Sequence, residues 1–132
     1  MRSLILFLIG LAIGALCTAM LVNALNRKTA YPHAVMTIMG QQMKALDGSV
    51  KQNRCAATDL TPRLQILRFV ANDIEPAFID LKDDAQFVRY AGDLRAAADA
   101  ALMTPPASCA AAAAAVSRLD KACDSCHRDF KD

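Results

Sequence analysis

The C-terminal segment of the chain contains two cysteines and a histidine at a chemically informative spacing. Cys123, Cys126 and His127 form the motif C-x-x-C-H. This motif is typical of covalent haem attachment, while its C-x-x-C part also occurs in redox-active dithiols and as half of a zinc site. Chance would produce the full motif in only roughly three of a thousand chains of this composition, so chance is the weakest explanation.

The zinc and dithiol readings lack their usual partners in the sequence. A structural zinc ion takes about four ligands, and His127 follows Cys126 too closely to bind the same ion easily. The only other histidine is His33, and no second C-x-x-C occurs. A thioredoxin-like dithiol belongs to a βαβ pattern, and no useful stretch of strand-like alternation is present. The motif therefore predicts one haem c per chain, and His127 as a surface histidine at a helix end is the alternative.

Four stripes of apolar residues at spacings of three and four predict four helices. The stripes cover residues 36–50, 60–81, 87–102 and 112–130. Short connections between them favour an all-α, antiparallel up-down-up-down four-helix bundle, formed by a single domain of residues 29–132. The alanine-rich stretch in residues 110–115 indicates strong helix propensity and close approach to a neighbouring helix.

Prolines and short polar residues are expected to mark the helix ends. Pro76, inside the second stripe, should kink or end that helix. The other expected markers are Pro32 and Pro62 in first turns, Thr61 and Ser108 as N-caps, Asp83 with Gln86 as a capping box, and Pro105 with Pro106 as a stop.

The antiparallel topology brings residues from both ends of the sequence together. The start of the first helix and the end of the fourth share one end of the bundle, so Met36 should lie level with His127. Met36 is then either an iron ligand or flexible core filler, the role expected of Met39 and Met43. His33 is the rival ligand, and bis-histidine ligation would give a lower reduction potential than a thioether.

The opposite end of the bundle should contain Cys55 and Cys109. An oxidising compartment would allow these two cysteines to form a disulfide, and two unpaired thiols are the alternative. Closing a loop of this length would add about 4 kcal/mol of stability in the chain-entropy model.

The first 28 residues form a separate segment. Residues 4–22 carry no charge, which is near the length needed to span a bilayer. We expect an uncleaved membrane anchor over residues 3–25, with a long export signal cut after Ala24 as the alternative. Cys17 lies inside this run and is interpreted as a small apolar side chain.

Charge and composition exclude other classes of function. All 13 acidic residues but only 12 of the 15 basic residues lie beyond residue 28, so that part has a formal charge of −1 and no basic nucleic-acid-binding character. No serine–histidine–acid set or phosphate-binding loop is apparent. The sequence therefore predicts a protein that is not an enzyme and does not bind nucleic acid.

A bundle with C-x-x-C-H on its last helix resembles the cytochrome c prime family and its low-spin, six-coordinate relatives. The ending of that family is matched by Cys123, Cys126, His127, Phe130 and Lys131, with lysine where arginine is usual. The first helix is similar as well, with Met36 four residues before Gly40. Pro32 stands where relatives usually have an arginine.

The resemblance implies thioether bonds to Cys123 and Cys126, His127 as the proximal iron ligand and Met36 as the distal one. Because c-type haem is attached outside the bacterial cytoplasm, it also implies a periplasmic bundle at the inner membrane. The expected function is one-electron transfer with redox partner proteins in or near that membrane. A five-coordinate protein that binds nitric oxide or carbon monoxide, and a haem subunit of a membrane redox complex, are the alternatives. A homodimer is left open.

Overall fold

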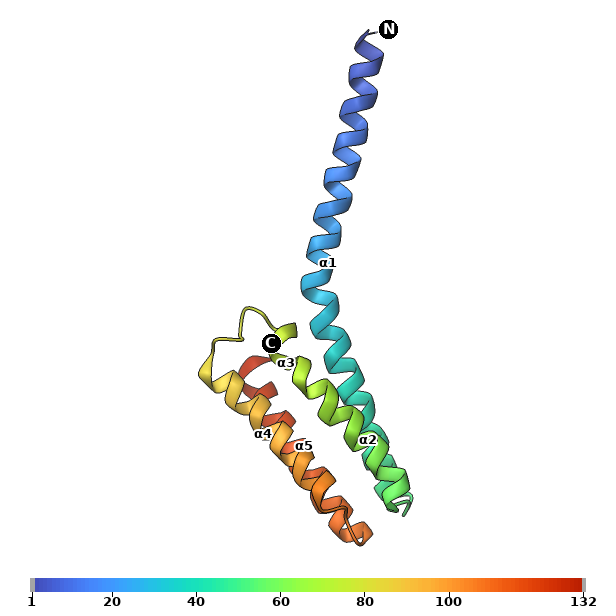
Figure 1. The fold of residues 1–132 in the computed structure, drawn as a ribbon, viewed down its shortest axis with the longest axis vertical. Coiled ribbons are helices and arrows are strands. Elements are labelled where there is room, and N and C mark those ends of the chain that lie inside the picture. The colour runs from blue at the N-terminus through green and yellow to red at the C-terminus, as the bar shows by residue number, and fades with distance from the viewer. Residues whose placement is uncertain (1, 132) are drawn as a thin grey trace.

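The computed structural model describes residues 2–131, with only the backbone described for Arg2, Leu4 and residues 25–28. Its elements are α1 (Arg2–Lys51), α2 (Ala57–Val70), the 3-10 turn η1 (Ala71–Asp73), α3 (Ile74–Ala77), α4 (Ala85–Met103) and α5 (Cys109–Phe130). Around the bundle, α1 contacts α2 and α5, and α4 contacts the same two helices (Figure 1). The predicted all-α four-helix bundle is confirmed.

The first helix is much longer than its apolar stripe suggested. α1 runs without a break from the N-terminal apolar segment into the bundle, so the expectation that Pro32 opens a helix is wrong. Residues 23–31 contain no glycine or proline that would end a helix. An internal proline removes one backbone hydrogen bond, and the exposed surroundings of residues 29–31 let water take its place.

The described side chains in the N-terminal part of α1 do not contribute to the hydrophobic core. All described side chains between Ser3 and Ala30 are exposed, and the first buried residue of α1 is Val35. Within residues 2–131, α1 is the one helix long and apolar enough to cross a membrane, a property that an N-terminal signal sequence shares. Cys17 lies exposed on this part of α1, where a bilayer would cover it.

Each long helix contributes one large, fully buried side chain to the core. These are Leu46 from α1, Leu67 from α2, Phe87 from α4 and Leu119 from α5. Where α4 ends and α5 begins, the buried residues are alanines instead: Ala98, Ala101, Ala112 and Ala115. Small side chains let α4 and α5 approach closely there.

The turn between α1 and α2 is a helix C-cap built on an asparagine. Asn53 has a positive φ of 55°, and the amide of Arg54 donates to the carbonyl of Ser49 over 2.8 Å. This is the pattern of a Schellman motif. α2 then begins at Ala57, so the prediction of Thr61 as its N-cap is wrong and Pro62 lies inside the helix. The carbonyl that Pro62 leaves unpaired belongs to the exposed residue Thr58.

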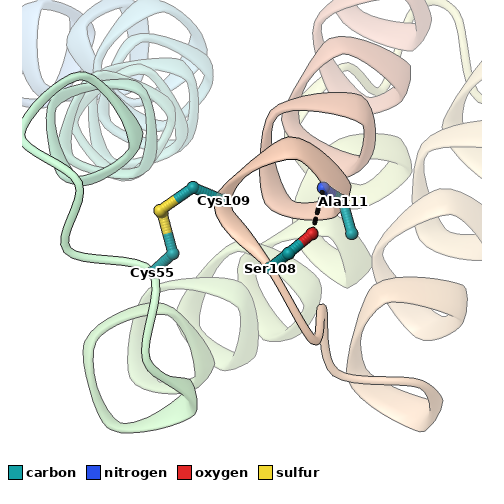
Figure 2. The surroundings of a disulfide bond; sticks show 4 residues. All are labelled: Cys55, Ser108, Cys109 and Ala111. Atoms are coloured by element: carbon teal, nitrogen blue, oxygen red, sulfur yellow. Dashed lines mark hydrogen bonds between the residues drawn. A yellow bond between two sulfur atoms is a disulfide. The ribbon is translucent and has the colours of Figure 1, made fainter.

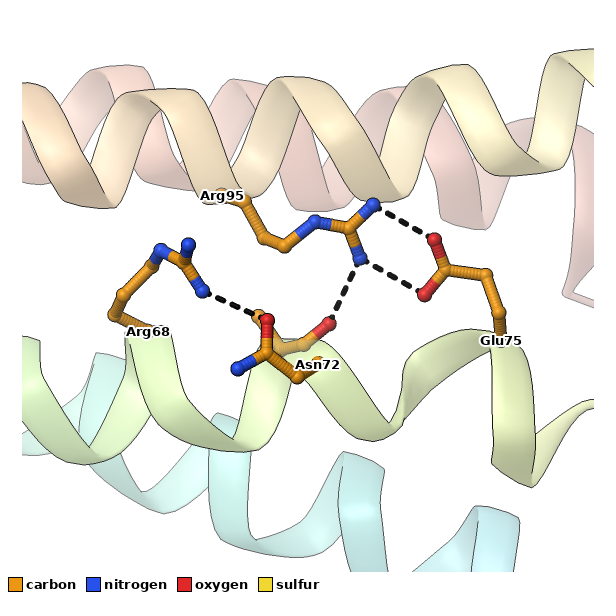
Figure 3. Close-up of polar contacts among 5 residues, drawn as sticks. Arg68, Asn72, Glu75 and Arg95 are labelled. Carbon is orange, nitrogen blue, oxygen red and sulfur yellow. Dashed lines mark hydrogen bonds and ion pairs between the residues drawn. The ribbon is translucent and has the colours of Figure 1, made fainter.

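The predicted break at Pro76 is confirmed. α2 gives way at Val70 to η1 and the short helix α3, which contains Pro76. Arg95 of α4 holds this irregular segment: its guanidinium donates to the carbonyl of Ala71 over 3.1 Å and to both oxygens of Glu75 over 2.7 and 2.8 Å (Figure 3). These hydrogen bonds lower the pKa of the Glu75 carboxyl. The break is therefore pinned against α4.

Side chains cap the last two helices. Asp84 is the N-cap of α4 and accepts from the amides of Gln86 and Phe87, so the capping box predicted at Asp83 is wrong by one residue. The loop continues one residue further than the sequence pattern indicated, because the backbone of Asp84 is still extended. Ser108 caps α5 by accepting from the amide of Ala111 over 3.1 Å, as predicted.

The predicted disulfide is present at the narrow end of the bundle. Cys55, in the loop after α1, is bonded to Cys109, the first residue of α5 (Figure 2). The bond joins the first pair of helices to the second at the end away from the C-terminus. It leaves Cys123 and Cys126 as unpaired thiols among the described residues.

Replacing both Cys55 and Cys109 by serine is expected to lower the free energy of unfolding by about 4 kcal/mol. The reason is that a crosslink between residues 54 positions apart no longer restricts the unfolded chain. Urea unfolding followed by far-ultraviolet circular dichroism measures this. The Cys17→Ser variant, which leaves the disulfide intact, is the control. An unchanged unfolding midpoint in the double variant would show that the bond adds no stability.

Candidate cofactor site

α5 presents the motif residues in its last two turns. Cys126 and His127 follow Cys123 by three and four residues, so each is a neighbour of Cys123 on the helix surface. Both cysteines are half-buried, whereas His127 is exposed at the rim. The seam of α5 therefore directs the two thiols toward the bundle interior, as the apolar spacing predicted.

The thiols face an apolar cavity of about 220 Å³ between α1, α4 and α5. Its walls include three methionines of α1, Met36, Met39 and Met43, together with Tyr90 and Leu94 of α4. Cys123, Cys126 and His127 complete the lining from α5. The structure thus brings together Met36, from the first part of the sequence, and the motif, from its end.

A second, more open cavity of about 510 Å³ adjoins the first at the end of the bundle. Met36, Cys126 and His127 line both cavities and therefore form the boundary between them. The outer cavity also has an aromatic wall and two residues with basic side chains, His33 and Lys131. We call the two adjoining spaces together the recess; both are mainly apolar, and His33 and Lys131 line only the outer one.

These residues fit a covalently bound haem. Two unpaired thiols lie beside an imidazole, and a thioether from another helix lines the same recess, which are the donor types that c-type haem requires. Among the described residues, no three histidine, cysteine or acidic side chains gather as they would around a bare metal ion. The chemistry of the donor set therefore matches haem better than zinc.

The surroundings of the thiols differ from those of a redox-active dithiol. Burial raises the pKa of the Cys123 thiol to about 11, and the nearby carboxylates of Asp120 and Asp124 add to this effect. Burial, followed by Asp129, also raises the pKa of Cys126. Reactive dithiols instead lie at helix N-termini or beside cations, which lower the thiol pKa. The C-terminal turns of α5 provide the opposite environment.

The two candidates for the second iron ligand occupy different places. Met36 is half-buried and lines both cavities, whereas His33 is exposed and lines only the outer one. The Nδ1 atom of His33 lies 3.4 Å from the hydroxyl of Thr37, one turn further along α1. Of the two, only Met36 therefore lines the inner cavity beside both cysteines.

A polar network that the sequence did not reveal fixes the last turn of α5 to α4. The hydroxyl of Tyr90 and the side-chain amide of Gln86 each donate to Oδ2 of Asp129 over 2.6 Å. The Tyr90 hydroxyl, and after it Gln86, hold the pKa of the Asp129 carboxyl below its usual range, although this group remains accessible to water. The one signal available in the sequence was Tyr90 itself, which lies beside the apolar seam of α4 and whose hydroxyl needs a partner when the ring is buried.

Contacts between aromatic rings also hold the last turn of α5 against α4. The ring of Phe130 meets that of Phe87 edge-on, with centroids 5.3 Å apart, and also packs against Tyr90 at 6.3 Å. Phe87 in turn packs against Phe78, which follows the break in the second helix. His127 is thus carried on a turn that both hydrogen bonds and ring contacts hold in position.

The Asp129→Asn substitution is expected to lower the midpoint of thermal unfolding at neutral pH, since neutral hydrogen bonds replace charge-assisted ones. A carboxyl with a lowered folded-state pKa stabilises the protein at neutral pH, and this stabilisation is lost as the pH falls through that pKa. The variant should therefore lose this part of the pH dependence, measured by thermal melts between neutral and acidic pH. The control is Asp124→Asn, at a carboxylate for which no hydrogen bond is found in the described part of the chain. Identical behaviour of the two variants would contradict a role for the network.

Comparison with models of protein families, with curated proteins and with solved structures finds no match to this chain.

Proposed function

We propose that the chain is a membrane-tethered monohaem c-type cytochrome that carries single electrons at the periplasmic face of the inner membrane. Its nearest counterparts would be the low-spin, six-coordinate proteins that resemble cytochrome c prime. One observation carries the proposal: the two unpaired thiols and the imidazole of C-x-x-C-H line the same recess as Met36, which comes from the opposite end of the sequence.

The unpaired state of Cys123 and Cys126 supports covalent attachment. Each thiol would add across one vinyl group of the porphyrin, with the sulfur bonding to one carbon and the hydrogen to the other. This addition needs neither an oxidant nor a reductant. The disulfide between Cys55 and Cys109, at the other end of the bundle, uses two further cysteines and leaves this pair free.

The remaining residues have separate roles in this proposal. When bound, the haem would supply an iron that gains and loses one electron. His127 and Met36 would hold that iron from α5 and α1, and a thioether ligand favours a higher reduction potential than a second histidine. The apolar walls exclude water, which limits reorganisation around the changing charge. Lys131 and His33 line the outer cavity and are the residues with basic side chains there that could contact the acidic side chains of the porphyrin.

A gas-binding protein is the second candidate, and one observation favours it. The outer cavity, which Met36 lines, is larger than the inner one, so a small ligand would have room beside Met36 if that residue does not bind iron. The protein would then resemble five-coordinate cytochrome c prime proteins that bind nitric oxide or carbon monoxide.

Absorption spectra of the purified ferrous protein, with and without carbon monoxide, separate the two candidates. An electron carrier with Met36 on the iron gives a low-spin spectrum that carbon monoxide leaves unchanged. A high-spin spectrum that shifts rapidly on adding carbon monoxide would overturn the electron-carrier proposal and favour gas binding. Absence of any haem band from protein matured with its c-type haem attachment machinery would overturn both.

A further inference from the structure

We propose that α1 is a rigid strut that points the open end of the recess toward the membrane, and that the partner is a membrane-embedded redox protein. This inference rests on the proposed function and on the retained N-terminal segment. It adds that the bundle stands at a fixed height above the membrane and in a fixed orientation. A globular soluble partner is then excluded from the face where the recess opens. The argument depends on where α1 leaves the bundle and how it is held there.

The recess lies at the end of the bundle from which the apolar segment projects. Figure 1 shows the C-terminus beside the point where α1 leaves the other helices, while the connection from α4 to α5 lies at the far end. Pro32, His33 and Met36, at this exit point, line the outer cavity together with His127 and Lys131. The mouth of the recess and the apolar segment are therefore on the same side.

The connection between the two is helical rather than flexible. α1 is one helix over Arg2–Lys51, so no loop separates the apolar segment from the bundle. At the exit point, burial and then the nearby carboxylate of Asp73 raise the pKa of the Tyr31 hydroxyl, and Val35, one turn later, is 3% exposed. These contacts fix the direction in which α1 leaves the bundle.

The length of helix between membrane and recess is short. Met36 follows Val22, the end of the apolar run, by 14 residues, which corresponds to about 21 Å of helix. The polar headgroup layer occupies about 6 Å of this distance. Roughly 15 Å thus remains between the membrane surface and the level of Met36.

A soluble carrier does not fit into this space. A globular protein of about 100 residues has a radius of gyration of about 13 Å, and is therefore roughly 30 Å across. A partner that reaches the mouth of the recess must instead present a low surface at the membrane. An integral membrane protein with short external loops meets this requirement.

The first test compares wild-type holoprotein in liposomes with a variant that has an 18-residue helical insertion between Asn26 and Arg27. Five full turns raise the bundle by about 27 Å without rotating it. The control has the same insertion between Pro105 and Pro106, at the far end of the bundle. Oxidation of the ferrous haem is followed by stopped flow, with ferricyanide as a small oxidant and an oxidised blue-copper protein as a bulky one.

We expect the raised variant to react with the blue-copper protein about tenfold faster than the wild type or the control, because docking at the recess becomes sterically allowed. Ferricyanide should oxidise all three at similar rates. In membranes from the cells that make the protein, reduction of the raised variant on adding NADH should be slower than that of the wild type. Equal rates with the blue-copper protein, or equal reduction in the membranes, would overturn the proposal.

A second measurement does not depend on haem. Nitroxide labels are introduced through a noncanonical amino acid at position 131, beside the recess, or at position 107, in the far loop. Addition of nickel-chelating lipid should enhance the relaxation of the label at 131 much more than that at 107. Equal enhancement of relaxation at positions 131 and 107 would overturn the proposal that α1 points the recess toward the membrane. A missing haem spectrum with the expected label result would instead count against the proposed function alone.

Discussion

The Met36→Ala variant is expected to convert a low-spin ferrous spectrum into a high-spin spectrum that responds to carbon monoxide. Met36 is half-buried and lines both cavities beside His127, so its removal would leave one face of the iron without a protein ligand. The affinity for carbon monoxide should rise at least about tenfold, equivalent to ~1.4 kcal/mol. Spectra and carbon monoxide titration of the purified ferrous variant measure both effects.

Two variants on the same helix provide the controls. Met43→Ala removes another methionine that lines the inner cavity and should leave the iron low-spin. His33→Ala removes the rival ligand at the mouth of the recess and should also have no effect on the spin state. A high-spin His33→Ala variant alongside an unchanged Met36→Ala variant would assign the sixth position to histidine.

Replacing both Cys123 and Cys126 by serine is expected to abolish covalently bound haem. Serine occupies nearly the same volume but its hydroxyl does not form the thioether bond, so haem should extract from the denatured variant into acidified organic solvent. The pyridine haemochrome of the protein fraction measures what remains. We expect the single variants to keep one thioether at most, with an α band displaced from that of the wild type.

The Cys17→Ser variant is the matched control, because Cys17 is the third unpaired cysteine and lies on the exposed N-terminal part of α1. Its haem content should equal that of the wild type. Covalent haem in the double Cys123→Ser, Cys126→Ser variant would show that attachment occurs elsewhere. Equal loss in the Cys17→Ser variant would point to a general folding defect.

The sequence predicted the bundle because its helices repeat a simple pattern. Leu46, Leu67 and Leu119 each fall on a stripe with spacings of three and four, and each is fully buried. The same periodicity placed Cys123 and Cys126 on the inner face of the last helix. Antiparallel topology then brought Met36 level with His127, and the structure confirms that the two line one recess.

Predictions at the helix ends were weaker because local signals compete there. Pro32 and Pro62 were both expected in first turns, yet each lies inside a helix where exposed backbone tolerates the missing hydrogen bond. The cap at Asp84 rather than Asp83 depends on one residue of loop conformation. Such choices follow from tertiary contacts that spacing does not encode.

The Tyr90–Asp129 contact could not be predicted for a related reason. It joins residues 39 positions apart, and its formation depends on the relative rotation of α4 and α5. Hydrophobic periodicity specifies which face is buried but not which polar side chain meets which partner. In the sequence, Asp124 and Asp129 are both acidic residues beside the C-x-x-C-H motif, and nothing there separates their roles.

The mass of the intact, denatured full-length protein tests the central claim most directly. Protein matured with c-type haem attachment machinery should have the mass of its polypeptide, with one disulfide, plus one haem. Fragmentation should place the added mass on the peptide that contains Cys123 and Cys126. A polypeptide mass without haem, or haem that is lost on denaturation, would contradict the account.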